Sequence, residues 1–163
     1  MKVNHAGEHG AVNIYRGQIL VAKLTAPSMV DTLKENQSHE KEHRALFWNE
    51  LQRRGRKRCR SYWLCGIGGF VLGFLTGLLG RKAIAATTVA VESVVLGHLE
   101  QQMEVLTPED PQAVAAISAI YEEEKLHHDQ HAAHVNDKDL WMKTLHPVVA
   151  ASTELVIWLG MRL

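Results

Sequence analysis

Two copies of the pattern Glu-x-x-His occur far apart in the sequence, at Glu40/His43 and at Glu124/His127. On a helix, residues three apart share a face, so each pair can offer a carboxylate oxygen and an imidazole nitrogen to one metal ion. A chain with ten histidines is expected to contain about one such pair by chance. The pairs alone therefore indicate a metal site only weakly.

A further glutamate precedes each pair by the same distance. Glu8 lies 32 residues before Glu40 (40 − 8) and Glu92 lies 32 residues before Glu124 (124 − 92), so one offset of 84 relates the two sets. In an antiparallel helix hairpin, residues equally far from the turn face each other. The first midpoint is position 24, beside a Thr-Ala-Pro-Ser break, and the second is Pro108. Both turns are therefore expected at the positions that would bring Glu8 opposite Glu40 and Glu92 opposite Glu124.

Four facing helices, of which two give one Glu and two give Glu-x-x-His, supply the ligand pattern of ferritin-like carboxylate bundles. This oxygen-rich set suits iron or manganese, and the two cysteines, Cys59 and Cys65, are too few for a structural zinc site. Taken singly, each glutamate is more often a solvated residue, so the hypothesis depends on the joint pattern. The predicted ligands, beyond which we expect no catalytic residue, are Glu8, Glu40, His43, Glu92, Glu124 and His127.

Other polar residues lie near these positions in the sequence. Asp129 is expected to accept the second ring N–H of a ligating imidazole, although a solvent-facing carboxylate is an equal alternative. The remaining candidates have no spacing that requires a role, and we expect them to be surface or packing histidines: His39, His98, His131 and His134.

The composition predicts the elements that must position these ligands. The chain has 163 residues, 46% of them apolar and 6% aromatic, a balance that favours one all-α domain over residues 1–163. Its basic and acidic residues balance at net zero, so the global charge gives no reason to expect a nucleic-acid partner. Helices are expected over about residues 3–25, 28–51, 83–106 and from Pro108 to about Asn136, with an apolar stretch at 63–80 and a last segment broken near Pro147.

The offset of 84 also maps residues 62–79 onto 146–163, one apolar segment onto another. Each half of the chain then becomes a three-helix unit with an apolar third helix, in a pseudo-twofold repeat around a four-helix bundle. Six glycines between Trp63 and Gly80 weaken an isolated helix, so a full membrane span is less favoured than a helix in the membrane surface or a close-packed core helix. We expect the two third helices to face lipid.

A basic run precedes the first apolar stretch. It is expected to contact anionic lipid headgroups, with about 1 kcal/mol from each side chain near the surface. Docking of an electron donor or of nucleic acid, and a merely solvated loop, are the alternatives. The first residues do not have the pattern of a secretory signal, so a reducing interior is expected. The run consists of Arg53, Arg54, Arg56, Lys57, Arg58 and Arg60.

Several segments, in order along nearly the whole chain, resemble the Coq7 family of demethoxyubiquinone hydroxylases. They are NHAGEHGA at 4–11, IY at 14–15, GQ at 17–18, EKEH at 40–43, VAVE at 89–92 and EEKLHHD at 123–129. The resemblance implies that Glu8 and His43 are terminal ligands of one iron, Glu92 and His127 are terminal ligands of the other, and Glu40 and Glu124 bridge the two. Members of the family commonly have Tyr in place of His9, and some have Tyr in place of Leu99, which affects tuning or substrate contact.

The resemblance further implies a monooxygenase of ubiquinone biosynthesis. It would hydroxylate the ring of a polyprenylated demethoxyubiquinol with O₂ as co-substrate and two iron ions per chain. Electrons would come from NADH or a reductase, and no Gly-x-Gly-x-x-Gly fingerprint follows a predicted strand. Expected partners are membrane lipid, an electron-donor protein and other ubiquinone-biosynthesis proteins. The expected location is peripheral, on the cytoplasmic face of the bacterial inner membrane or the matrix side of the mitochondrial one.

Two other functions are compatible with the same residues. One is a ferritin-like peroxidase, such as rubrerythrin or manganese catalase. The other is a non-catalytic quinone- or lipid-binding membrane protein that keeps the fold without needing metal.

Overall fold

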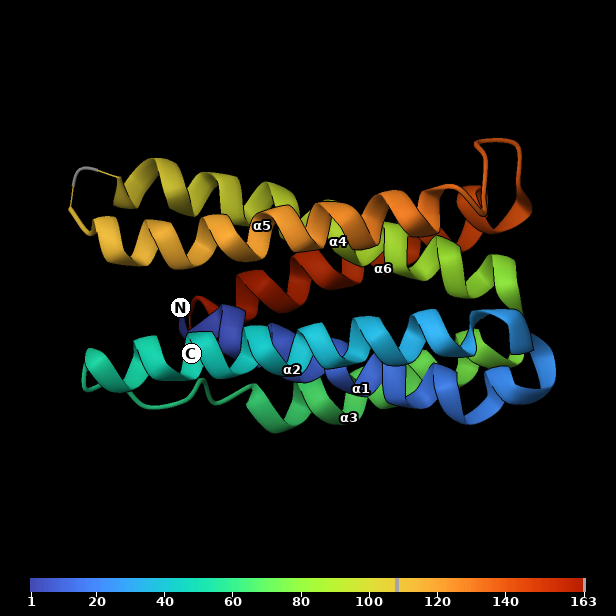
Figure 1. Cartoon of the computed structure of the whole chain (residues 1–163), viewed down its shortest axis with the longest axis horizontal. Helices are drawn as coiled ribbons and strands as arrows, with labels where there is room; N and C mark the ends of the chain where they lie inside the picture. Colours follow the sequence, from blue (N-terminus) through green and yellow to red (C-terminus); the bar gives the residue numbers. More distant parts are fainter. Residues whose placement is uncertain (108, 163) are drawn as a thin grey trace. The chain divides into compact units, whose positions relative to one another are not determined.

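A computed structural model describes residues 1–107 and 109–162, in which the regular elements are helices (Figure 1). This confirms the predicted all-α class. The elements are α1 (Lys2–Thr25), the 3-10 turn η1 (Pro27–Met29), α2 (Val30–Arg53), α3 (Tyr62–Leu78), α4 (Arg81–Leu106), α5 (Pro111–Ala132) and α6 (Leu140–Gly160).

The chain divides into two compact units. Unit 1 comprises Met1–Ile84 with Leu155–Leu163, and unit 2 comprises Ala85–Glu154. The boundary after Ile84 coincides with the repeat offset of 84 seen in the sequence. The prediction of one domain over the whole chain stays a prediction.

In unit 1, α1 and α2 form an antiparallel hairpin, and they lie side by side in Figure 1. The chain turns at Ala26, whose N–H is donated to the carbonyl of Ala22, and Pro27 occupies the first position of η1. Across the hairpin, Gln37 Nε2 donates to the carbonyl oxygen of Val12 at 3.1 Å. These two residues lie almost equally far from the turn, which confirms the register predicted from the glutamate spacing.

The third helix of unit 1 packs on α1 through glycines. A Cβ atom at Gly69 would collide with the carbonyl oxygen of Gly10, and one at Gly73 with that of Ile14. The points of contact advance in the same direction along both helices, so α1 and α3 run parallel. The glycines of α3 therefore allow two helix backbones to touch, as small residues do in close helix pairs.

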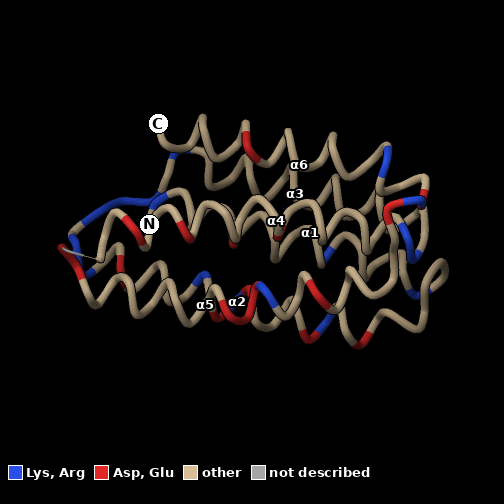
Figure 2. The backbone as a smooth tube through the Cα atoms, turned by 90° about the horizontal axis from the view of Figure 1, so that it is seen from above, with Lys and Arg blue, Asp and Glu red and all other residues tan. Residues whose placement is uncertain are grey.

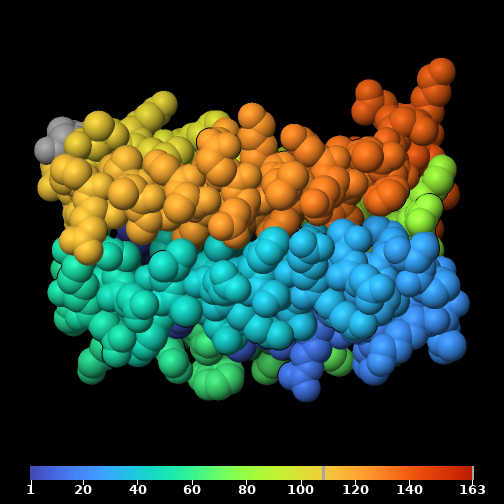
Figure 3. Space-filling model, in the orientation of Figure 1, coloured from blue at the N-terminus to red at the C-terminus, as the bar shows by residue number. Residues whose placement is uncertain are grey.

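The opposite face of α3 is apolar and exposed. Its exposed residues Trp63, Ile67, Val71 and Leu75 follow one another every four positions. Figure 2 shows α3 without charge along its length, and Figure 3 shows one face of unit 1 covered by α2, with α3 projecting at its edge. The predicted apolar third helix is thus a close-packed helix on one side and an exposed apolar surface on the other.

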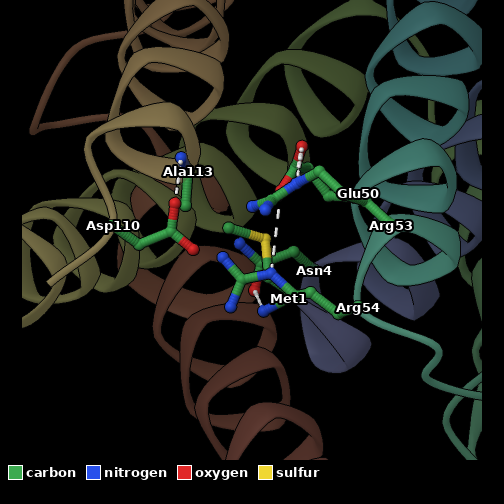
Figure 4. Close-up of polar contacts among 7 residues, drawn as sticks. All are labelled: Met1, Asn4, Glu50, Arg53, Arg54, Asp110 and Ala113. Carbon is green, nitrogen blue, oxygen red and sulfur yellow. Dashed lines mark hydrogen bonds and ion pairs between the residues drawn. The ribbon is translucent and has the colours of Figure 1, made fainter.

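Unit 2 contains a second helix hairpin, formed by α4 from Ala85 onward and α5, which run alongside each other in Figure 1. Asp110 caps α5, because its Oδ1 accepts the N–H of Ala113 at 3.1 Å (Figure 4). Pro108, the predicted midpoint of this hairpin, lies outside the described residues. The described flanks of the turn, Thr107 and Glu109, nevertheless separate the two helices where the glutamate spacing predicts.

Two predicted boundaries in the last third of the chain are wrong. α5 ends at Ala132 rather than near Asn136, because Asn136 and Asp139 accept backbone N–H groups with their side chains and build a turn instead. α6 begins at Leu140 and continues through Pro147, where a break was predicted. A proline removes one helical N–H bond, and packing of the following turn, in which Val149 is buried, offsets that loss.

Among the described residues, one helix, α4, is long and apolar enough to cross a membrane by length and composition. Its most apolar 18-residue window is 61% buried, as the core helix of a protein that does not cross a membrane also is. The apolar helix α3 is shorter.

Candidate metal centre

Unit 1 brings its three predicted ligands together. Glu8 from α1 and Glu40 and His43 from α2 offer ligand atoms that all lie within 4.8 Å of one another. Each of the three side chains is at most 5% exposed. His43 Nδ1 lies 3.7 Å from Glu40 Oε2, so the two residues spaced three apart meet on one helix face.

Unit 2 repeats this arrangement with its own residues. Glu92 from α4 and Glu124 and His127 from α5 also offer ligand atoms within 4.8 Å of one another, and all three are buried. His127 Nδ1 lies 3.6 Å from Glu124 Oε2, which matches the corresponding distance in unit 1. Two clusters of the same composition and local geometry thus stand at positions related by the offset of 84.

The helical repeat explains why these polar residues are buried. Glu40 and His43 fall in a buried stripe of α2 with spacings of three and four, which is the core-facing pattern of a bundle helix. Glu124 and His127 fall in an equivalent stripe of α5. The stripe of α2 contains Leu33, Asn36, Glu40, His43, Phe47 and Glu50. That of α5 contains Ala113, Ile117, Ile120, Glu124, His127 and His131.

The donor set of each cluster fits a divalent transition metal. Burying two carboxylates in one place is unfavourable unless a cation or hydrogen bonds compensate. Carboxylate oxygens with one imidazole suit iron or manganese, and the two cysteines stand elsewhere, with Cys59 beside Ser61 and the carbonyl of Gly160. Each unit therefore presents a carboxylate-rich set of ligand atoms with one imidazole.

Asp129 lies on the exposed side of α5. Its carboxylate is 3.0 Å from His128 Nδ1, and its side chain is 64% exposed. Among the described residues the structure therefore brings Asp129 to His128 rather than to the ring of His127, for which it was predicted.

The structure separates the basic run into two groups. Arg53 forms a bidentate contact with Glu50, with Nη2 to Oε2 at 2.7 Å, and Arg54 Nε lies 3.6 Å from the same carboxylate (Figure 4). Arg58 lies over the rings of Trp48 and Tyr62, 4.6 and 4.9 Å from their centroids. The second group lies exposed in the loop before α3 and consists of Arg56, Lys57 and Arg60.

Stacked rings surround the start of α1, close to Glu8 in the sequence. His9 stacks on Tyr62 with centroids 4.0 Å apart, and His5 lies 4.9 Å from the same ring. Burial, and then the nearby charges of Arg58, Arg44 and His9, lower the pKa of His5 to about 4. His5 is thus a neutral ring in the interior of unit 1 at pH 7.

One of the histidines predicted to be surface or packing residues is a packing residue. His131 is 1% exposed and continues the stripe of Glu124 and His127 by one more helical turn. Burial, and then His134 and His127, lower the pKa of His131 to about 3. Extending the spacing of three and four residues beyond His127 would have indicated its burial.

Comparison with known proteins identifies the family of the chain. The family model for ubiquinone biosynthesis protein COQ7 matches residues 1–160. The 3-demethoxyubiquinol 3-hydroxylase of Rhodospirillum rubrum is 32% identical over 162 residues, covering 99% of this chain and 76% of that protein.

Two mitochondrial relatives carry the name NADPH-dependent 3-demethoxyubiquinone 3-hydroxylase. The protein of Dictyostelium discoideum is 34% identical over 170 residues, covering 99% of this chain and 75% of its own length. The protein of Homo sapiens is 34% identical over 168 residues, covering 100% of this chain and 76% of its own length. With its full-length match and its two Glu and Glu-x-x-His clusters, the chain belongs to the family of ubiquinone biosynthesis protein COQ7.

Proposed function

We propose that this protein is a 3-demethoxyubiquinol 3-hydroxylase, which adds a hydroxyl group from O₂ to the ring of a polyprenylated demethoxyubiquinol. Relatives that align over 99 to 100% of the chain are named for this reaction or for the corresponding quinone. The observation that carries the proposal is the burial of a Glu and Glu-x-x-His cluster in each unit. Such ligands are those expected of an oxygen-activating iron enzyme.

The two clusters are proposed to hold one dinuclear iron centre, which makes the two units one functional domain. Glu8 and His43 would bind one iron and Glu92 and His127 the other. Glu40 and Glu124 would bridge the two ions. The matched distances of 3.7 and 3.6 Å within the two Glu-x-x-His pairs support equivalent roles for the two halves. When bound, the iron pair would supply the reduction and activation of O₂ that the side chains lack.

The protein's own residues provide position and exclusion of water. The ligands occupy core positions of α1, α2, α4 and α5, so their carboxylates are held on rigid helices rather than on loops. A buried site limits the access of water to the reacting ring. In this proposal the ring hydroxylation needs no further acid or base from the chain.

The reductant is proposed to be a reduced pyridine nucleotide or a separate donor protein. The mitochondrial relatives are named as NADPH-dependent. The described residues of this chain form no strand, so a dinucleotide would not bind here through a strand-turn-helix fingerprint.

The substrate tail places the enzyme at a membrane surface in this proposal. The exposed apolar face of α3, which includes Trp63, Ile67 and Val71, would lie against lipid. The exposed loop cations Arg56, Lys57 and Arg60 stand just before this helix, where they would meet anionic headgroups. The bacterial and mitochondrial relatives are compatible with either the cytoplasmic face of a bacterial inner membrane or the matrix face of a mitochondrial one.

Isotope transfer tests the proposed reaction. Iron-loaded protein is incubated with a short-chain demethoxyubiquinol, a chemical or enzymatic reductant and ¹⁸O₂, and the product is analysed by mass spectrometry. The expected product is the hydroxylated quinol with one ¹⁸O atom. A product without the isotope, or no product with any reductant, would overturn the proposal.

A further inference from the structure

α5 carries two buried histidines on the face that holds the unit 2 cluster: His127, which belongs to the cluster, and His131, four residues later. The exposed His134 stands in the turn that follows α5, where its N–H is donated to the carbonyl oxygen of His131 at 3.0 Å. Side chains four residues apart on a helix are neighbours, which places His131 one helical turn from His127. The turn hydrogen bond places His134 directly after His131. The three histidines therefore follow one another from the exposed turn to the cluster.

The repeated half of the chain shows that packing does not require a histidine at position 131. The offset of 84 places Phe47 at the equivalent position of α2 (131 − 84), and Phe47 is completely buried. Glu50 stands at the position equivalent to His134 (134 − 84). An apolar ring fills this place in unit 1, so the imidazole in unit 2 calls for another explanation.

The ring of His131 suits metal binding. An imidazole offers a nitrogen donor to a divalent transition-metal ion, which the phenyl ring of Phe47 in unit 1 does not.

We propose that His134, His131 and His127 form a metal-loading ladder that carries a divalent cation from solvent to the unit 2 cluster. This inference rests on the metal centre of the proposed function. An aqueous ion cannot shed its water into an apolar interior without a large free-energy cost. Along the three histidines, each imidazole nitrogen replaces one water ligand of the cation. The cation binds the next ring before it dissociates from the previous one. The ion keeps its charge throughout, and no electron is transferred.

Cobalt(II) uptake by the metal-free full-length protein tests the ladder. Uptake is followed by the visible absorption of bound cobalt after rapid mixing, and the final number of ions per chain is measured separately. In His131→Phe, which copies the residue of unit 1, uptake is expected to slow by about tenfold or more, because the variant must pass a higher barrier without this nitrogen donor. The final number of bound ions and their affinity are expected to match the wild type. His134→Gln should slow uptake in the same direction.

The control is His128→Gln, on the same helix but facing Asp129. It should take up cobalt at the wild-type rate. An unchanged rate in both ladder variants would overturn the ladder while leaving the metal centre intact. A lower final number of ions in His131→Phe would also overturn it, because His131 would then be a permanent ligand. Wild-type protein that takes up no cobalt would overturn the centre and the ladder together. Thermal unfolding verifies that each variant is folded, and His131→Gln replaces the Phe variant if the latter is not.

Discussion

Glu124 connects the sequence pattern to the proposed chemistry at the scale of single residues. It lies buried on α5 and meets His127 of its own Glu-x-x-His pair. Glu124→Gln keeps the shape of the side chain and removes the charge that would bind both ions. We expect hydroxylation to fall by at least about a hundredfold, because a direct ligand contributes no less than the outer-sphere groups of metal sites. Product formation and iron content, measured on the same samples, check this.

The matched control is Glu122→Gln, which changes an exposed carboxylate two residues away on the same helix. It should keep wild-type iron content and turnover. Full activity in Glu124→Gln, with iron retained, would remove this residue from the ligand set.

His5 makes the stability of the metal-free protein depend on pH. Its folded-state pKa is lowered from 6.5 to about 4, chiefly by burial. Between these values the unfolded chain binds a proton that the folded chain does not, so the free energy of unfolding falls as the pH decreases from 6.5 towards 4. In His5→Asn this fall is expected to be shallower. Urea unfolding at several pH values measures it, and parallel pH curves for the two proteins would contradict the assignment.

The meeting of Glu8, Glu40 and His43 could be predicted because helix geometry fixes which residues come together. Glu8 and Glu40 are equidistant from a turn that Pro27 marks in the sequence, and His43 follows Glu40 at the spacing of one helical face. For His131 the prediction left surface and packing positions open, since a single histidine on a helix does not indicate burial until its neighbours are known to be buried. Asp129 was assigned from its place in the chain alone, and its contact with His128 depends on which way the side chain turns.

At the scale of elements, the contact between α1 and α3 depends on glycines that admit no side chain. In Gly73→Ala, the new methyl group would meet the carbonyl oxygen of Ile14. Forcing the helices apart is expected to lower the free energy of unfolding by about 1–3 kcal/mol. Gly68→Ala is the matched control on the same helix, where a Cβ has nothing within 4 Å. The control should be neutral or stabilising by up to about 1 kcal/mol, because alanine favours helix.

Chemical denaturation of the two glycine variants measures these changes. Equal stability of Gly73→Ala and Gly68→Ala would contradict the close approach of the two helix backbones.

The loop before α3 makes a separable prediction about membranes. Replacing Arg56, Lys57 and Arg60 with Gln should weaken binding to anionic vesicles by about a hundredfold, since each cation near the surface contributes about 1 kcal/mol. Arg53 and Arg54, whose guanidinium groups are held by Glu50, should matter much less when they are replaced with Gln. Vesicle sedimentation at low and high salt measures binding.

If the Arg53 and Arg54 replacements weaken vesicle binding as much as the Arg56, Lys57 and Arg60 replacements do, the Glu50 contacts do not distinguish the two groups. If neither set of replacements weakens vesicle binding, the basic run does not bind lipid.

Most helix bounds could be predicted from the apolar periodicity and from the Pro and Gly residues that end helices, with two exceptions. Local helix propensity predicts only that the glycines of α3 weaken this helix. In the structure the backbone of α1 packs against them, and this contact could not be predicted from the residues of α3 alone. The break expected at Pro147 does not occur, because tertiary packing of α6 outweighs the loss of one backbone hydrogen bond.

At the scale of the whole molecule, the offset of 84 residues relates ligand sets, buried stripes and apolar third helices. Each unit by itself contains a helix hairpin with one Glu opposite one Glu-x-x-His pair. Sequence spacing could predict this repetition because the glutamates and histidines keep the same spacing in the two halves, although the helices differ in length, for example 17 residues in α3 and 21 in α6. It could not predict that Leu155 and the residues after it group with unit 1, which depends on contacts between residues far apart in the chain, such as that of Cys59 with the carbonyl of Gly160.

The central claim, that the two clusters act as one two-iron centre, is tested most directly by the magnetic state of the oxidised iron protein. Iron is added to the metal-free chain, counted, and examined by electron paramagnetic resonance after oxidation. Two irons per chain with no resonance from isolated ferric ions are predicted, because two ferric ions held together by Glu40 and Glu124 would couple to a spinless ground state. Two irons per chain that both give the full signal of isolated high-spin ferric ions would contradict a shared centre.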